Sequence, residues 1–96
     1  MRTILNVNFY SAQMMVSTAF MVAHNKILFI YDVLNSKIVK RIDFTSQVIK
    51  LQRIEVRKGV YNVLAIMENG QIIWLVNSDA DYQEPEGWKI DVSRNQ

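Results

Sequence analysis

The sequence predicts an all-β fold made of two four-stranded antiparallel meanders. One observation is that apolar and polar residues alternate in short runs, which Asn, Gly, Asp and Ser interrupt; this is the pattern of strands and turns. The other is an internal repeat. Residues 25–32 match residues 70–77, polar on polar and apolar on apolar, and residues 41–44 recur as residues 89–92. A repeat in the low forties is typical of a unit of four strands.

The first unit is expected over about residues 3–46. Its strands are predicted at residues 4–9, 15–22, 26–32 and 38–44, with polar turns between them. The segment 14–22 is rich in Val, Ser, Thr and Phe, which are weak helix formers, and no capping residue precedes it. We therefore predict a strand rather than a helix here.

The second unit is expected over about residues 48–93. Its strands are predicted at residues 48–56, 60–67, 71–76 and 88–92. Because successive side chains of a strand point to opposite faces, the alternation in the first of these strands places Ile49, Leu51 and either Ile54 or Val56 toward the core.

The turns of the second unit differ in length. The residues Arg57-Lys58-Gly59 form the first turn, and Asn69-Gly70 predicts a tight hairpin, since this pair readily takes the positive φ values of a type I′ turn. The loop over residues 77–87 is long and acidic, and it contains the only proline, Pro85. The second copy of the repeat therefore carries an insertion before its last strand.

Residues 27–39 resemble the third strand, turn and fourth strand of a WD-repeat blade. Tyr31-Asp32 stands where that family has its Trp-Asp pair, and a polar turn followed by Lys37 leads into the fourth strand. In the second copy Val76-Asn77 occupies the same place, so the signature is lost there. The Gly-His pair that precedes the first strand in the family is absent from both copies. The family's Asp between the second and third strands is replaced by His24 or Asn25 and by Asn69 or Gly70.

The resemblance implies about two diverged blades of a β-propeller. The alternative is an unrelated β-meander, a small barrel or roll, whose hairpins happen to repeat. Two blades do not close a ring, and exposed sheet edges are templates for pairing. We therefore expect the chain to be completed by further blades, by a protein partner or by copies of itself in a homo-oligomer.

Composition narrows the classes of protein to consider. The chain has 96 residues, which is one small domain, and half of them are hydrophobic, so it is not a disordered chain. It has no cysteine, which fits the cytoplasm or another reducing compartment inside the cell. The apolar segment 14–23 is interpreted as a buried strand rather than a signal peptide, and no run of 18 apolar residues predicts a membrane helix.

The net charge of +2 conceals an asymmetry. Residues 1–58 contain nine Lys and Arg against three Asp and Glu, whereas residues 59–96 contain two against six. Such halves attract each other, or a partner, through complementary fields. The simpler interpretation is two solvated faces.

The sequence contains little that points to catalysis, a cofactor or a metal. The single histidine, His24, lies in a predicted turn, and no phosphate-binding loop or nucleophile elbow is present. The acidic loop offers oxygen ligands, but its spacing is not that of an EF-hand. Asp43 and Asp91 recur at matching positions of the two units, which predicts a repeated structural role.

We therefore expect a non-catalytic protein-interaction scaffold, without a cofactor, within a larger assembly. Partner binding is expected at one end of the second unit, where the first and third connections lie on the same side. The residues there are Arg57, Lys58, Asp79, Asp81, Glu84 and Glu86.

Two alternatives stay open. A carbohydrate-binding lectin with two blades per chain that oligomerises into a ring would use Trp74 and Trp88. A single-stranded nucleic-acid module would use the seven basic residues of the middle of the chain, which are Lys37, Lys40, Arg41, Lys50, Arg53, Arg57 and Lys58. One observation argues against the nucleic-acid alternative: we expect the core to bury the neighbouring aromatic residues, which are Phe29, Tyr31, Phe44 and Tyr61.

Overall fold

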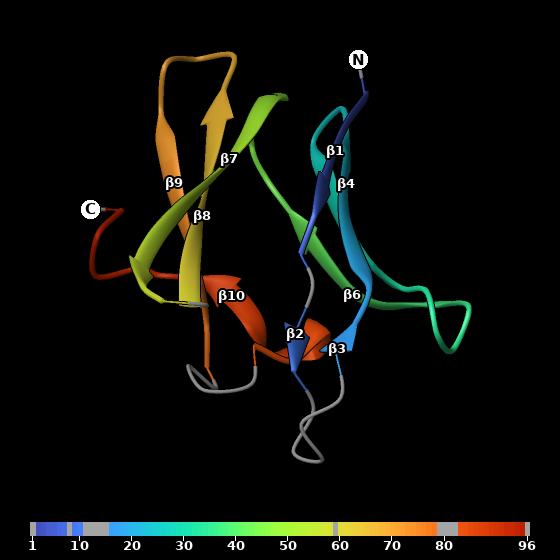
Figure 1. Ribbon diagram of the computed structural model, residues 1–96. Coiled ribbons are helices and arrows are strands. Elements are labelled where there is room, and N and C mark those ends of the chain that lie inside the picture. Colours follow the sequence, from blue (N-terminus) through green and yellow to red (C-terminus); the bar gives the residue numbers. More distant parts are fainter. Residues whose placement is uncertain (1, 8, 11–15, 59, 79–82, 96) are drawn as a thin grey trace.

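The computed structural model describes residues 2–7, 9–10, 16–58, 60–78 and 83–95, and these residues form two four-stranded antiparallel sheets (Figure 1). The first sheet consists of β1 (Arg2–Asn6), β4 (Ala19–His24), β5 (Ile27–Asp32) and β6 (Lys37–Asp43). The second consists of β7 (Val48–Arg57), β8 (Val60–Met67), β9 (Ile72–Asn77) and β10 (Trp88–Ile90). No α-helix occurs in these residues, so the predicted all-β fold of two four-stranded meanders is confirmed.

A short ribbon extends the first hairpin. Its strands β2 (Phe9–Tyr10) and β3 (Val16–Ser17) continue the register in which β1 pairs with β4. The two strands predicted at residues 4–9 and 15–22 are each divided between one strand of the sheet and one of the ribbon. A single turn of 3-10 helix, η1 (Pro85–Gly87), precedes β10.

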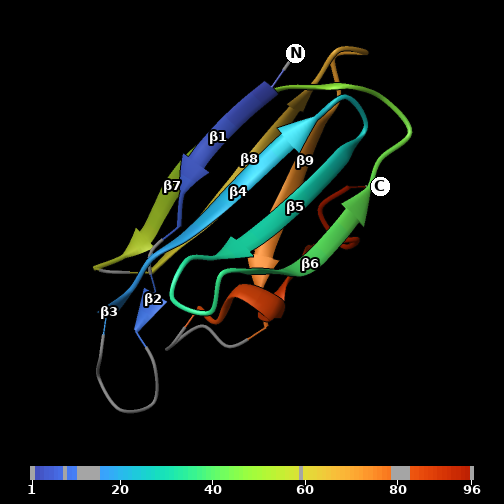
Figure 2. The ribbon, with the colours of Figure 1, turned by 90° about the vertical axis from the view of Figure 1, so that its right-hand side faces the viewer.

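The chain passes from the last strand of the first sheet to an edge strand of the second. The strand orders are β1-β4-β5-β6 and β7-β8-β9-β10, so each sheet is a simple meander. β1 contacts β7, and the two strands run in the same direction along one side of the molecule (Figure 2). The first strands of the two sheets thus lie together.

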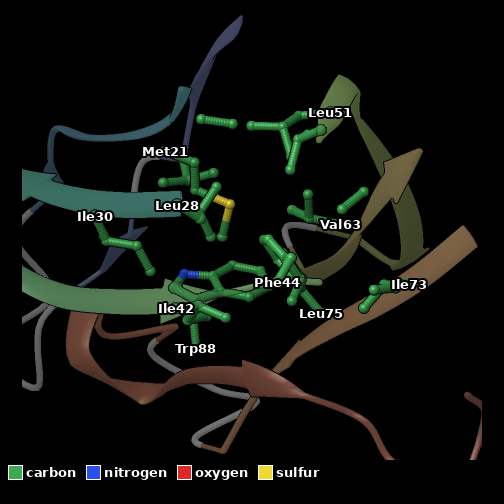
Figure 3. Close-up of a cluster of buried hydrophobic side chains, with 14 of the residues drawn as sticks. Met21, Leu28, Ile30, Ile42, Phe44, Leu51, Val63, Ile73, Leu75 and Trp88 are labelled. Carbon is green, nitrogen blue, oxygen red and sulfur yellow. The ribbon is translucent and has the colours of Figure 1, made fainter. Parts of the chain in front are cut away.

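The core lies between the two sheets. Met21 and Leu28 of the first sheet and Val63 and Leu75 of the second point into the space between them (Figure 3). Trp88 is fully buried in the same cluster. Burying a side chain of this size contributes roughly 1.5–3 kcal/mol, so this packing is the main force that holds the sheets together.

Three local predictions were wrong. Leu51 is buried as predicted, but Ile49, also expected in the core, is 42% exposed, because a register shift between Val48 and Lys50 turns Val48 inward instead. The expectation for Ile54 or Val56 was wrong as well, since Ile54 faces outward and Val56 is 53% exposed. The hairpin after β8 is not a type I′ turn. Gly70 has a φ of 87° whereas Asn69 has no positive φ, and the Gly70 amide donates to the Met67 carbonyl at 3.0 Å. This is a longer hairpin loop that ends with a glycine in the left-handed region.

Candidate functional site

The most unusual feature of the molecule is that the inner strands of both sheets are largely apolar on the face turned away from the core. Cross-strand partners share a face, so the register identifies the residues of each face. On the first sheet the outward side chains of β4 and β5 alternate with the buried ones. The apolar residues of the first outer face are Ile4, Phe20, Val22, Ile27, Phe29, Tyr31 and Ile38, and the same register places Arg2, Asn6, His24, Arg41 and Asp43 at its margins.

The second sheet has a matching surface. Leu64 pairs with Trp74 and Ile66 pairs with Ile72, while the residues between them, Ala65 and Ile73, are buried in the core. The apolar residues of the second outer face are Ile54, Leu64, Ile66, Ile72, Trp74 and Val76, and the same register places Lys50, Gln52, Asn62 and Lys89 on it.

Several side chains of these faces are open to solvent. Ile38 is 57% exposed on the first outer face, and Ile72 is 50% exposed on the second. In a two-layer sheet protein the outward residues are normally polar, because that side meets water. These two faces depart from that pattern, and contiguous apolar surface of this kind marks an interaction site.

Charged residues border the outer faces. Lys50 and Lys89 lie on β7 and β10, which are the edge strands of the second sheet, and Arg41 lies on the edge strand β6. The Arg41 guanidinium lies 5.9 Å from the centre of the Phe29 ring, and it pairs with Asp43 at 3.0 Å. Each face therefore has an uncharged centre and a charged border, which is the usual composition of a protein interface.

The second outer face is partly covered by the segment after β10. The Arg94 guanidinium lies 4.5 Å from the centre of the Trp74 ring, and its Nε lies 3.3 Å from Oδ2 of Asp91. The Asn95 side chain accepts from the Trp74 amide at 3.2 Å and donates to the Trp74 carbonyl at 3.4 Å. These contacts continue the pairing along β9 beyond the end of β10.

Hydrogen bonds fix the turn that carries Arg94. Oδ1 of Asp91 accepts from the Ser93 amide at 3.1 Å and from the Ser93 hydroxyl at 2.6 Å. These bonds, followed by the Arg94 charge, lower the pKa of Asp91 below its ordinary value of 3.8. Asp43, at the matching position of the first unit, accepts instead from Arg41 two residues earlier. The two aspartates therefore do not share one structural role.

The predicted partner-binding residues lie at one end of the second sheet. Arg57 ends β7 and Lys58 follows it, both exposed, and Figure 1 shows this turn at the same end of the sheet as η1. Glu86 is exposed, whereas Glu84 is half-buried and its carbonyl accepts from Nδ2 of Asn77 at 2.8 Å. Asp79 and Asp81 lie outside the described residues.

An open depression of about 370 Å³ lies near this end and is lined by Arg53, Glu55 and Tyr61. The Arg53 guanidinium lies 5.6 Å from the centre of the Tyr61 ring. Burial raises the pKa of Tyr61 above its ordinary value of 10.0, although Arg53 opposes the shift. The phenol therefore stays protonated at neutral pH. No pattern in the sequence indicated this depression, because Glu55 and Tyr61 meet only through strand pairing.

The buried tryptophan beside this depression has an unusual environment. The Trp88 ring lies 5.9 Å from the Tyr61 ring, and no acceptor among the described residues receives its indole N–H. Because Trp88 is fully buried, it cannot stack on a sugar, and the lectin alternative loses one of its two tryptophans.

The aromatic residues of the nucleic-acid alternative fall into two groups. Phe44 is buried as predicted, but the prediction was wrong for Phe29 and Tyr31, which lie half-buried on the first outer face.

Asp32, at the WD-like position, is buried and caps a turn, accepting from Nδ2 of Asn35 at 2.7 Å. His24 lies exposed at the end of β4. The described residues contain no group of three His, Cys, Asp or Glu able to hold a metal.

Comparisons of the chain with models of protein families, with curated proteins and with solved structures find no match. None of the helices among the described residues has the length and apolar character that crossing a membrane requires.

Proposed function

We propose that this protein is a non-catalytic interaction scaffold whose outer sheet faces pack against further β-sheets, as the blades of a β-propeller do. The observation that carries the proposal is that the inner strands of both sheets, β4, β5, β8 and β9, are apolar on both faces over most of their length. Strands that are covered on both sides have this composition, whereas a free two-layer sandwich alternates between apolar and polar residues.

The order of the strands supports the same proposal. Each sheet is a meander, the first strands β1 and β7 lie together and run in one direction, and β6 leads directly into β7. A propeller repeats four-stranded sheets around an axis in this way, and each sheet stacks on its neighbours. On this proposal the WD-like residues Tyr31-Asp32 are the remnant of a blade signature, and the protein works in a reducing compartment such as the cytoplasm.

Binding of single-stranded nucleic acid is the second candidate. Phe20, Phe29 and Tyr31 lie on the first outer face, and Arg41 lies beside them. Aromatic rings among basic side chains form stacking platforms for bases. The pairing of Arg41 with Asp43 and of Arg94, over Trp74 on the second outer face, with Asp91 favours the protein partner, because both cations already have a carboxylate partner.

Site-specific photo-crosslinking tests the proposal. A benzophenone amino acid is placed at Ile38, at Ile72 or, as the control, at Leu34, which is 73% exposed in the turn after β5. We expect adducts to protein from the two face positions and not from the turn, in cells that express the natural gene. Adducts to nucleic acid at Ile38 would favour the second candidate. Equal labelling at all three positions, or at none, would contradict the proposal.

A further inference from the structure

We propose that Asn69 is a site of spontaneous covalent modification, where its side-chain amide becomes a carboxylate through a cyclic imide, and that the hydrogen bonds of its loop direct the reaction there. Asn69 is the only asparagine of the chain that glycine follows, and both residues are exposed in the hairpin loop between β8 and β9. A side chain on the next residue would hinder attack by its backbone nitrogen, and glycine has none. The site lies away from the outer faces, so it does not depend on the proposed function.

The reaction exchanges one bond for another at Cγ of Asn69. The backbone nitrogen of Gly70 loses its proton to water or hydroxide and bonds to Cγ, the Cγ–Nδ2 bond breaks, and ammonia leaves after taking a proton from solvent. Water then opens the imide at one of its two carbonyl groups. Opening at the side-chain carbonyl gives aspartate. Opening at the main-chain carbonyl gives isoaspartate, in which the main chain runs through the side-chain carbons. Water is the only co-reactant.

A hydrogen bond holds the side chain of Asn69 toward the peptide bond that attacks it. Oδ1 of Asn69 accepts from the amide of Gln71 at 3.0 Å, so the side chain folds forward along the chain beside Gly70. Negative charge develops on the same oxygen during the attack, and a donor that is already in place stabilises it. The leaving group Nδ2 donates to none of the described residues. No atom lies within 4 Å of the position that a Cβ would take at Gly70, so water reaches the imide.

The turn after β5 contains a second asparagine in the same backbone setting. Asn35 is exposed and precedes Ser36. The Ser36 amide donates to the Val33 carbonyl at 3.2 Å. In the same way, the Gly70 amide donates to the Met67 carbonyl at 3.0 Å. Ser36 and Gly70 both have positive φ, 51° and 87°. The attacking nitrogen is therefore restrained alike in the two turns.

The two asparagine side chains are held in opposite directions. Nδ2 of Asn35 donates to Oδ2 of Asp32 at 2.7 Å, which turns the side chain back toward the preceding residues and holds the leaving group. Asn69 is held forward and its leaving group has no such bond. Because an intramolecular attack depends steeply on the orientation of the reacting atoms, the structure favours conversion at Asn69 over Asn35.

Conversion would change a contact between the two halves of the molecule. The Asn69 amide donates to Oγ of Ser46 at 3.3 Å, and the Glu68 amide donates to the Gln47 carbonyl at 2.8 Å. Ser46 and Gln47 belong to the connection between β6 and β7, which joins the sheets. Isoaspartate lengthens the main chain at the first of these donors, and either product places a second negative charge beside Glu68. The modification therefore weakens the attachment of the hairpin loop to this connection.

Ageing of the purified protein in mildly alkaline buffer tests the proposal. Peptide mass spectrometry measures conversion at each asparagine, and electron-transfer fragmentation distinguishes isoaspartate from aspartate. In the folded wild type we expect Asn69 to convert at least about tenfold faster than Asn35.

Ser36→Gly is the matched variant, because it makes both dipeptides Asn-Gly in turns with the same backbone bond. The positive φ of Ser36 suits glycine, and circular dichroism confirms that the variant is folded. We expect Asn69 to stay at least about fivefold faster than Asn35 in the folded variant, since only the direction of the side chain still differs. In urea the two rates should become alike, because the turns are lost.

Three results would overturn the proposal. The first is an absence of conversion at Asn69 in the folded wild type. The second is equal rates at Asn35 and Asn69 in folded Ser36→Gly, which would mean that the following residue alone sets the rate. The third is a difference that persists in urea, which would assign it to the flanking sequence and not to the loop.

Discussion

The two sheets follow the same strand plan, but their third and fourth strands are joined in different ways. In the first sheet a short turn suffices, and Asp32 caps it by accepting from Nδ2 of Asn35 at 2.7 Å. In the second sheet Asn77 holds the matching position, and its Nδ2 reaches Glu84, seven residues later, at 2.8 Å. The insertion therefore lengthens the loop and also forms a hydrogen bond with the residue that ends β9.

The insertion closes one end of the space between the sheets. Nε2 of Gln83 donates to the Tyr61 carbonyl at 2.6 Å, and Gln83 and Pro85 are both buried. η1 contacts β5 and β6 of the first sheet. A segment that belongs to the second unit thus helps to fasten the two units together. The comparison shows that one copy of the repeat supplies packing on which both copies depend.

The largest effect is expected from removing the side chain that this segment buries. Trp88→Ala should lower the free energy of unfolding by about 3–5 kcal/mol, because it leaves a large cavity between the sheets. That loss is comparable to the whole stability of many small domains. Denaturation in urea, followed by circular dichroism, measures it.

Trp88→Phe is the matched control for this prediction. It keeps an aromatic ring in the core and removes the indole N–H, which has no acceptor in the part of the chain that the structure describes. Since a buried donor without a partner costs about 1–3 kcal/mol, its removal should offset much of the lost volume. If Trp88→Phe lowers the free energy of unfolding as much as Trp88→Ala does, the indole N–H has an acceptor in solution.

A smaller effect is expected at the glycine that ends the insertion. A Cβ at Gly87 would lie 2.4 Å from Oδ1 of Asn77, so Gly87→Ala should cost about 1–3 kcal/mol through overpacking. In the background Asn77→Ala the same substitution should cost less, because the obstructing side chain is gone. Urea denaturation of the four proteins in this cycle measures the coupling.

Gly70→Ala provides the comparison. No atom lies within 4 Å of a Cβ at Gly70, and the cost there comes only from its φ of 87°. The loss of stability caused by Gly70→Ala should therefore be the same in the wild-type background and in the Asn77→Ala background. Coupling of Asn77 to Gly70 as strong as its coupling to Gly87 would mean that the substitution acts on the unfolded chain and not on this contact.

The alternation of the sequence identified the strands, but it did not decide which face of each strand is covered. Phe29 and Leu28 are both apolar neighbours on one strand, and only packing against the second sheet decides that Leu28 is buried and Phe29 lies outside. Where both faces of a strand are apolar, the sequence pattern is the same for the two faces and does not show which of them is buried. For this reason the outer faces, which form the candidate site, could not be predicted.

Local irregularities were missed for a related reason. The register shift next to Ile49 inverts the expected direction of one side chain, and a bulge adds a residue without changing the composition of the strand. The role of Trp88 was also missed. Trp88 is buried in the cluster between the sheets and its ring lies 5.9 Å from the Tyr61 ring, a contact between segments that are distant in sequence.

The smallest effect is expected at the turn that fastens the segment after β10 to the second outer face, a feature that the first sheet does not share. Because the pKa of Asp91 is lowered in the folded protein, its stabilising contribution is present above the ordinary value of 3.8 and is lost as the pH falls through the lowered pKa. Asp91→Asn should therefore melt at a slightly lower temperature than the wild type near neutral pH, and the two should converge in acid. Asp43→Asn removes a negative charge at the matching position of the repeat and controls for net charge. A difference between wild type and Asp91→Asn that persists unchanged in acid would show that the Ser93 bonds act through geometry and not through the charge of the carboxylate.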